Sequence, residues 1–596
     1  MKAERKGKLS KSNLFLWCMC AIFICGGCQL ANNVMRGSIR ENGSGESPPP
    51  PLVFSYSAEP VYFKGESLNL NPMVSSGTGV SWSIAPDLPA GLVFDSSTGQ
   101  ISGTPSAYLN EQTFQVTAQD ESQNLVSATF SLILGQRLVV DILADSSQDN
   151  NPGDGLCDDG SSQCSLRTAM TEAEGLGDVY SKIELSSGVY SVSGSAIAIG
   201  DGNIHVYGLG PTLTEVSGGG TIQILNATGT TELSAEGVAF TNGNSGGVSG
   251  GALYFFGKKL ELRRCRFSNN AGHWGGAINT VYVENILVDE CTFENNSTID
   301  VSWGSGGALR MQTISSDAQA IIQNSTFTSN TAHSVGGAIE LGGPTEFILT
   351  GNVYDQNHAL GGGGTNGGAI HVFSSGASAS IEITDSIFTS NTAVGSGGAV
   401  SIEDDALQVV IARNLFRDNS SNQGGALHLV SDDDILVENS TFFENIAANY
   451  GGAIYAPAYL GEKPTLSHLT FHNNSAPTIG GHVRSGDIIV QNSIFSTTAS
   501  GDGCTWGPTD LVSMGGNLDV GTTCGFGATG APNDADSVTL NLGSLADNGG
   551  PSLTIRPQAG SPAIDNGVSS VCAAKDQRNI SRPLGNSCDS GAVEAE

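Results

Sequence analysis

Six aspartates stand close together in one glycine-containing stretch of the sequence: Asp141, Asp145, Asp149, Asp154, Asp158 and Asp159. Carboxylates in such a loop supply the hard oxygen ligands that calcium prefers. Their spacing matches no EF-hand, so a solvated loop without a metal is the alternative. We expect any calcium to be held by Asp145, Asp149, Asp154, Asp158 and Asp159, and the sequence suggests no other cofactor.

Groups that could catalyse a reaction on a polysaccharide are sparse. A lyase would need a calcium-binding carboxylate cluster and a base, and a glycoside hydrolase would need paired carboxylates. The runs Asp404-Asp405 and Asp432-Asp433-Asp434 occur in turn-like segments, where solvated side chains are the ordinary interpretation. Basic residues gather at 258–266, and no carboxylate cluster can be placed opposite them. We therefore assign no catalytic residue.

The cysteines indicate an exported protein with disulfides. Four of the twelve lie before residue 29, and the other eight are Cys157, Cys164, Cys265, Cys291, Cys504, Cys524, Cys572 and Cys588. An even number in an exported chain is typical of disulfides, with sequence neighbours pairing across short loops. Cys265 and Cys291 occupy equivalent positions of two successive repeats, where a disulfide or two stacked buried thiols would fit.

The N-terminus has the layout of an export signal. Basic residues precede an apolar run from Leu14 to Ile24, which is too short for a mature membrane-spanning helix. The run ends at Cys25-Gly26-Gly27-Cys28, which resembles the lipobox of bacterial lipoprotein signal peptides, although Cys25 stands where an aliphatic residue is usual. The resemblance implies lipidation of Cys28, with ordinary signal-peptidase cleavage as the alternative. Residues 1–28 are the expected signal peptide, and residues 29–51, which end in four prolines, the expected tether.

The formal net charge of −33 restricts the possible partners. Nucleic acid and anionic membrane surfaces should repel such a chain, whereas divalent cations should not be repelled. Solubility outside the cell is a sufficient reason for the acidity.

Residues 52–136 contain short alternating runs such as VSWSI and TFQVTA, which predict a small β-sandwich. The stretches LPAGL at 88–92, Thr98-Gly99 and ISGTP at 101–105 resemble the immunoglobulin-like modules of bacterial surface proteins. The resemblance implies a spacer domain. No cysteine occurs here, so the predicted core depends on Trp82, Phe94 and Phe114.

A tetrapeptide, Gly-Gly-Ala followed by an aliphatic residue, recurs through the middle of the chain. Eight intact copies, 25 to 31 residues apart, begin at Gly250, Gly275, Gly306, Gly336, Gly367, Gly397, Gly424 and Gly451, and a decayed copy at Gly480 has His482 in place of alanine. Between the copies, an aromatic residue is followed three positions later by asparagine, at Phe267, Phe293, Phe327, Tyr354, Phe388, Phe416, Phe442 and Phe471. The two elements together resemble the repeat of the polymorphic outer-membrane protein family of autotransporters over residues 250–483.

Stacking of these repeats is also what physical chemistry predicts. Short strands cannot bury an apolar face alone, and parallel stacking pairs every backbone edge. The aromatics should then stack inside, the asparagines should form a ladder at the turns, and Gly-Gly should form a sharp corner. The predicted fold is all-β: a right-handed parallel β-helix (pectin-lyase-like solenoid) over residues 179–540, preceded by the small Ig-like β-sandwich.

Two further segments flank the predicted β-helix. Residues 137–178 contain CSLRTA at 164–169, which resembles the CSLREA cap of exported bacterial β-helices with Thr168 in place of glutamate. A short helix beginning near Ser165 could cover the first turn. Residues 541–596 resemble the tail module of exported β-helix proteins that carry interchangeable surface anchors, through DNGGP at 547–551, DQR at 576–578 and CDSGAVE at 588–594. We expect lipid at Cys28 to supply the attachment.

These patterns indicate a cell-surface lipoprotein, exported and lipid-anchored in the outer membrane, with an adhesin-like, ligand-binding or structural role. The expected partners are the membrane, through the lipid, and host or cell-surface glycans or proteins. We expect a monomer that binds no nucleic acid. The alternative is a carbohydrate-active β-helix enzyme, either a polysaccharide lyase or a glycoside hydrolase. An enzyme should show carboxylates and a base converging on one sheet, whereas a display protein should show small and polar residues along it.

Overall fold

The computed structural model describes residues 51–595, apart from residues 230 and 365 and the segments 314–317, 344–345, 362–363, 374–378, 404–406, 431–433, 458–462, 498–502 and 507–510. The expected signal peptide, Cys28 and residues 29–50 of the tether lie outside the described residues, as do Asp404, Asp405, Asp432 and Asp433. None of the described helices combines the length and apolarity that crossing a bilayer requires.

The first domain is an antiparallel β-sandwich. Its strands are β1 (Val53–Tyr56), β2 (Tyr62–Phe63), β3 (Leu68–Leu70), β4 (Pro72–Ser76), β5 (Gly79–Ala85), β6 (Leu92–Phe94), β7 (Ile101–Gly103), β8 (Leu109–Asp120) and β9 (Leu125–Val139). Trp82 and Phe114 are buried in its core, and Phe94 packs at the margin. Gly99 has a φ of +76°, and a β-carbon there would lie 2.8 Å from the Trp82 indole, so the motif glycine makes room for the core tryptophan.

Strand β9 belongs to two sheets. Its residues 125–134 pair with β8, and its last residues, Gln136–Val139, pair in parallel with β10 (Tyr180–Glu184) of the β-helix. The sequence places a domain boundary after residue 136, which lies inside this continuous strand.

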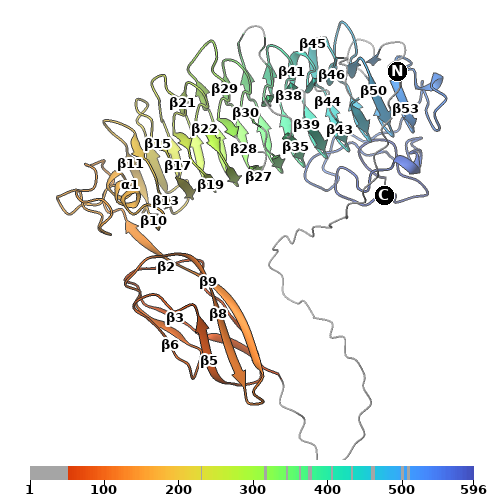
Figure 1. Ribbon diagram of the computed structural model, residues 1–596. Helices are drawn as coiled ribbons and strands as arrows, with labels where there is room; N and C mark the ends of the chain where they lie inside the picture. Colours follow the sequence, from red (N-terminus) through yellow and green to blue (C-terminus); the bar gives the residue numbers. More distant parts are fainter. Residues whose placement is uncertain are drawn as a thin grey trace, which may run out of the picture. The chain divides into compact units, whose positions relative to one another are not determined.

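The β-helix consists of parallel sheets to which each turn adds one strand apiece (Figure 1). Sheet 1 contains β10, β13 (Asn203–Tyr207), β16 (Glu232–Glu236), β19 (Lys259–Arg263), β23 (Asn285–Asp289), β27 (Gln319–Gln323), β31 (Glu346–Thr350), β35 (Ala379–Thr384), β39 (Leu407–Ala412), β43 (Ile435–Glu438), β47 (Thr465–Ser467), β50 (Ile488–Gln491) and β53 (Leu511–Gly515). Sheet 2 follows in each turn, with β11 (Gly188–Ser191), β14 (Thr214–Ser217), β17 (Ala239–Thr241), β20 (Arg266–Ser268), β24 (Thr292–Glu294), β28 (Thr326–Thr328), β32 (Val353–Asp355), β36 (Ile387–Thr389), β40 (Leu415–Arg417), β44 (Thr441–Phe443), β48 (Thr470–His472), β51 (Ile494–Phe495) and β54 (Leu518–Asp519).

Two more sheets complete the turns. The short sheet 3 contains β21 (Ala271–Gly272), β25 (Ser297–Thr298), β29 (Thr331–Ala332), β33 (His358–Ala359), β37 (Thr392–Ala393), β41 (Ser420–Gln423) and β45 (Ile446–Tyr450). Sheet 4 contains β12 (Ile197–Ile199), β15 (Leu225–Thr228), β18 (Leu253–Phe256), β22 (Ile278–Val283), β26 (Leu309–Thr313), β30 (Ile339–Gly342), β34 (Ile370–Phe373), β38 (Val400–Glu403), β42 (Leu427–Val430), β46 (Ile454–Ala456), β49 (Val483–Ser485) and β52 (Cys504–Thr505). The predicted all-β fold, a β-helix preceded by an Ig-like domain, is confirmed.

The interior is organised in columns of like residues. The aromatic side chains from Phe267 to Phe471 stack along the axis with ring centroids 4.7 to 5.2 Å apart. The asparagines form the predicted ladder, in which Asn357 Nδ2 donates to Asn391 Oδ1 at 2.9 Å and to the Phe327 carbonyl at 2.9 Å. Since every amide in this column is buried, the ladder satisfies polar groups that would otherwise be unpaired.

The Gly-Gly corners are fixed by two constraints. The first glycine of each intact motif has φ between +62° and +71°. The second faces the same corner of the next turn, so a β-carbon on Gly307 would lie 1.9 Å from the Gly337 carbonyl oxygen. Neither position can accept a side chain without moving the backbone.

Helix α1 (Leu166–Gly175) packs against β10, β12 and β13 at the first turn (Figure 1). Ser165 is its N-cap and accepts a hydrogen bond from the Thr168 backbone. Its residues Ala169, Met170 and Ala173 are buried against the first turn, so a helix covers the end of the stack, as the sequence predicts.

The C-terminal residues, which include the 3-10 helices η1 (Phe526–Ala528) and η2 (Ser569–Val571), pack along the side of the last turns. Gln577 Oε1 accepts from Thr441 Oγ1 at 2.6 Å, and its Nε2 donates to the Asn414 carbonyl at 3.0 Å. The Ala592 backbone donates to Thr470 Oγ1 at 3.0 Å. This segment therefore joins several turns laterally, in addition to following the last one.

Candidate functional site on the outer face of sheet 4

The residue that follows each Gly-Gly-Ala-aliphatic motif faces outward on sheet 4. The aliphatic residue points inside, as Ile370 does, so strand alternation turns the next residue out. The strand register pairs these outward residues from one turn to the next. We call them, together with the equivalent residue one turn earlier, the outer row: Asn226, Tyr254, Asn279, Arg310, Glu340, His371, Ser401, His428, Tyr455 and Arg484.

The middle of the outer row is buried although it lies outside the β-helix interior. Glu340, His371 and His428 are each no more than 8% exposed. The segments that precede the motifs contribute to this shielding, because Ser305, which stands directly before the motif at Gly306, hydrogen-bonds Glu340. The row is thus a polar strip held away from bulk water, where electrostatic interactions are strengthened.

One ion pair lies on the N-terminal side of this strip. Arg310 Nε is 2.7 Å from Glu340 Oε2, with both side chains largely buried. The guanidinium group also lies 5.0 Å from the centroid of the Trp274 ring, within the range of a cation–π contact. Arg310 is therefore held between a carboxylate and an aromatic face.

A carboxylate with two imidazoles occupies the centre. Glu403 Oε1 lies 3.3 Å from His428 Nδ1, and Glu403 Oε2 lies 3.8 Å from His371 Nε2. Ser401 Oγ is 2.9 Å from His428 Nδ1 and donates to Glu403 Oε1 at 3.1 Å. Burial would raise the pKa of Glu403, but hydrogen bonds and charge interactions with the two histidines outweigh it and hold that pKa well below its usual value. Glu403 is therefore ionised at neutral pH.

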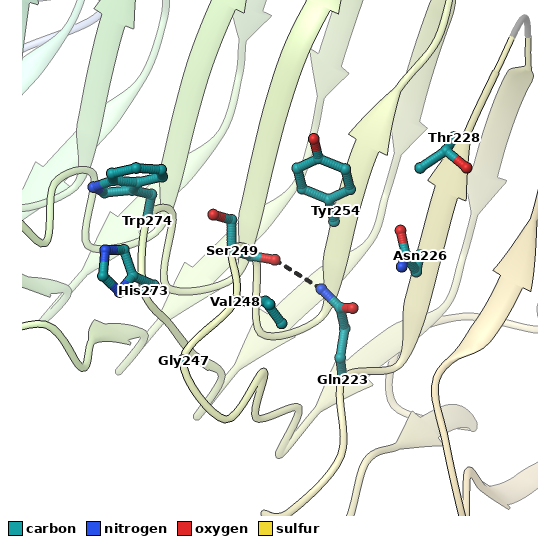
Figure 2. Close-up of a pocket in the computed structure, with 9 residues that line it drawn as sticks. All are labelled: Gln223, Asn226, Thr228, Gly247, Val248, Ser249, Tyr254, His273 and Trp274. Carbon is teal, nitrogen blue, oxygen red and sulfur yellow. Dashed lines mark hydrogen bonds between the residues drawn. The ribbon is translucent and has the colours of Figure 1, made fainter.

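A cavity of about 500 Å³ lies where the outer row begins (Figure 2). Asn226, Thr228 and Tyr254 reach it from strands β15 and β18, and loop residues complete the lining: Gln223, Gly247, Val248, Ser249, His273 and Trp274. Figure 2 shows His273 and Trp274 on one side, Asn226 and Thr228 on the other, and Tyr254 between them. The volume is within the range of small-molecule sites.

Exposed aromatic side chains border this cavity. Trp274 Nε1 donates to the Trp303 carbonyl at 3.2 Å, and the Trp303 side chain is 73% exposed. Phe256 pairs in register with Thr228 and contacts Tyr282 edge to face at 5.6 Å. Solvent-exposed aromatics gathered around one cavity are typical of a binding surface.

The aspartates that are expected to hold calcium have other partners in this structure. Asp145 binds Arg167 through both oxygens, at 2.9 and 2.7 Å. Asp149 accepts from the backbones of Asn151 and Asp158, while Asp154, Asp158 and Asp159 each accept from the backbone N–H two residues later. Within the described chain, no three of these carboxylates bring oxygens within 4.8 Å of one another. These hydrogen bonds favour the alternative of a loop without a metal, and calcium binding by the loop stays a prediction.

The other predicted candidates have structural partners. Four of the basic residues at 258–266, namely Lys259, Arg263, Arg264 and Arg266, form ion pairs beside sheets 1 and 2. Asp434 is exposed. His482 is fully buried, with Nδ1 3.2 Å from Asn474 Nδ2 and Nε2 2.9 Å from the Ser496 carbonyl.

Three disulfides join sequence neighbours, as predicted: Cys157–Cys164, Cys504–Cys524 and Cys572–Cys588. Cys265 and Cys291 are free and buried, so the stacked-thiol alternative is the one observed. The pKa of Cys291 is raised by burial. His468 lies near the Cys572–Cys588 pair, but disulfide sulfurs are poor metal ligands, so this group is not a metal centre.

Sequence reasoning did not identify the outer row. It assigned no role to any residue of the row, or to Glu403, which follows Ser401 by two positions on β38. A signal was present, because the position after the motif reads Tyr, Asn, Arg, Glu, His, Ser, His, Tyr, Arg in successive repeats. The constant motif forms the corner of each turn, and the variable position after it determines which side chain that turn places in the outer row.

Comparisons with known proteins support two of the resemblances. The family described as "Putative Ig domain" matches residues 49–135, and the Chlamydia polymorphic membrane protein repeat matches residues 324–341 and 439–457. The chain is similar to metabotropic glutamate receptor-like protein R of Dictyostelium discoideum, at 27% identity over 259 residues, and to probable autotransporter YfaL of Escherichia coli K12, at 29% over 189 residues. These alignments cover 41% and 27% of this chain and 15% of each relative.

Among solved structures, the family 28 exopolygalacturonase of Yersinia enterocolitica aligns with 78% of this chain and 97% of its own, with 10% identity and a TM-score of 0.27. A likeness at this level supports no inference about activity. The resemblances to a lipobox, a CSLREA cap and a tail module stay predictions.

Proposed function

We propose that this chain is a surface-displayed, adhesin-like β-helix protein that binds its ligand along the outer row. The observation that carries the proposal is the contrast between a constant interior and a row of outward side chains whose type changes almost every turn. Solenoids commonly bind partners on such extended faces, because each repeat contributes one position.

Display at the cell surface is part of the proposal. The matches to the polymorphic membrane protein repeat and to an autotransporter support it, as do the three disulfides, which form in oxidising compartments. Lipid at Cys28 would hold the protein in the outer membrane, and residues 29–51 would serve as the tether. Host or cell-surface glycans or proteins are the proposed partners.

A binding experiment with matched variants tests this role. The mature chain is labelled and applied to host cells and to a glycan array. One variant replaces Arg310, Tyr455 and Arg484, outer-row residues that are partly exposed, with alanine, and the control replaces Arg263, Tyr207 and Arg417, the same residue types on sheets 1 and 2. We expect binding to be lost only in the outer-row variant. Equal binding by both variants, with equal thermal stability, would contradict the proposal.

The alternative function, a carbohydrate-active enzyme, is favoured by one observation. An ionised carboxylate, Glu403, contacts two imidazoles on one sheet, which are groups that could transfer protons. Incubation with acidic and neutral polysaccharides, followed by assay for new reducing or unsaturated ends, distinguishes the two functions. Product that disappears in Glu403→Gln would establish the enzyme, whereas absence of product from every substrate leaves the binding role.

A further inference from the structure

We propose that the cavity at the start of the outer row binds a neutral sugar residue. This inference rests on the proposed function, since it names the ligand class for one end of the binding surface. It also places that ligand at nine specific residues, which lie on β15 and β18 and on the loops beside them.

The first argument is the combination of aromatic and polar groups. Tyr254 and Trp274 offer ring surface to the cavity, and Trp274 is 36% exposed. A pyranose ring has an apolar face of C–H groups that packs on such surfaces, and an edge of hydroxyl groups that requires hydrogen bonds. Amide and hydroxyl groups on the opposite side, from Asn226 and Thr228, meet that second requirement (Figure 2).

The second argument is an unsatisfied atom. Asn226 Oδ1 is buried and has no hydrogen-bond partner among the described residues. Gln223, beside it, is already engaged, because its Nε2 donates to the Ser249 and Gly250 carbonyls at 2.7 Å each. A buried acceptor without a donor is unfavourable, and a ligand hydroxyl group would satisfy it. A purely apolar ligand would leave Asn226 Oδ1 unpaired.

The third argument is charge. None of the nine described lining residues is Asp, Glu, Lys or Arg. The nearby cation, Arg310, is paired with Glu340, and His273 lies 2.9 Å from Asp300 Oδ2. No free cation is thus presented to a sugar carboxylate, and the net charge of −33 repels one. The cavity therefore favours neutral sugars over uronic or sialic acids.

Calorimetric titration of the full mature chain with short oligosaccharides tests the proposal. The ligands are malto-, cello-, manno-, galacto- and xylo-oligosaccharides, with oligogalacturonate as the acidic counterpart. The cavity variants are Trp274→Ala and Asn226→Leu, and the control is Phe443→Ala, an aromatic on β44 of sheet 2, outside the outer row. We expect at least one neutral oligosaccharide to bind, with Kd raised about tenfold by each cavity variant and unchanged by the control.

Three results would overturn the inference: no binding by any neutral oligosaccharide, a preference for oligogalacturonate, or unchanged affinity in both cavity variants. Trp274→Phe retains an aromatic ring and is the control for misfolding. It should bind with most of the affinity that Trp274→Ala loses. If the outer-row triple variant abolishes cell binding while no short sugar binds, the inference fails and the proposed function stands. If sugars bind in the cavity while the triple variant leaves cell binding intact, the proposed function fails instead.

Discussion

Asn474 and His482 close the asparagine ladder, with Asn474 Nδ2 3.2 Å from His482 Nδ1. An amide nitrogen only donates, so Nδ1 must accept and the proton must be on Nε2, which then donates to the Ser496 carbonyl at 2.9 Å. His482 is therefore neutral in the folded protein. At this repeat His482 replaces the alanine of the Gly-Gly-Ala motif, and its Nδ1 accepts the last hydrogen bond of the ladder.

Acid should weaken the C-terminal turns through His482. Burial lowers the pKa of His482 from 6.5 to about 4. Between these values the unfolded chain binds more protons, so the free energy of unfolding falls as pH drops from about 6.5 to about 4, by roughly 3 kcal/mol. His482→Gln keeps an acceptor but does not titrate. Urea unfolding of both proteins at pH 7.5 and 4.5 should show the smaller loss in the variant, and parallel losses would contradict this prediction.

Phe388→Ala should weaken the middle of the stack. The ring is fully buried between Tyr354 and Phe416, at centroid distances of 4.7 and 4.8 Å. Its removal should cost about 3–5 kcal/mol through lost burial and a cavity. Limited proteolysis should cut this variant in the central turns, since each turn contacts only its neighbours. Phe373→Ala, an exposed phenylalanine on β34, is the control and should resist cleavage as the wild type does.

Cys164→Ser should loosen only the N-terminal cap. The Cys157–Cys164 bond closes a loop beside α1, and its loss should cost about 2–3 kcal/mol. Protease should then trim the chain near residue 160 and leave the turns intact. Cys265→Ser, which removes a free thiol, serves as the comparison. Cleavage throughout the Cys164→Ser variant would show instead that the cap nucleates the entire fold.

Gly307→Ala should be among the most damaging single substitutions. Its β-carbon would lie 1.9 Å from the Gly337 carbonyl oxygen, so the corner must open and neighbouring turns must separate. Gly521→Ala, whose β-carbon would approach nothing closer than 3.4 Å, is the matched control. Thermal unfolding should show a lowered Tm or poor folding for Gly307→Ala alone, and equal Tm values would refute this account of the corner.

Calcium should not stabilise the aspartate loop. Its carboxylates already accept hydrogen bonds from backbone N–H groups or bind Arg167. A metal that binds the native state raises the Tm, so addition of Ca²⁺ or of EDTA should leave the Tm unchanged. A Ca²⁺-dependent rise that disappears in Asp149→Asn would restore the metal hypothesis.

The interior could be predicted from the sequence because stacking places like residues together. An aromatic residue followed three positions later by asparagine, as in Phe388 and Asn391, recurs once between successive motifs, so this repetition alone indicates the aromatic stack and the asparagine ladder. In a stack of repeats, each residue packs against the equivalent residue of the next turn. Its neighbours can therefore be predicted by aligning the repeats with one another.

The outer row could not be predicted from the sequence in the same way. Its residues differ from turn to turn, and the burial of Glu340 depends partly on Ser305, which belongs to an irregular segment between the strands. Metal binding by the aspartate loop is hard to predict for a related reason. Whether Asp149 binds a metal or the Asp158 backbone depends on turn geometry that the spacing of carboxylates does not reveal.

The lateral packing of the C-terminal residues has a consequence for the order of events during synthesis and export. The early turns need only their neighbours, so they can form as soon as they emerge. The side of the turn at Asn414 obtains its partner, Gln577, only after 163 further residues have appeared. One side of the last turns therefore stays uncovered until residues 577–592 have been synthesised, which makes this packing a late step of folding.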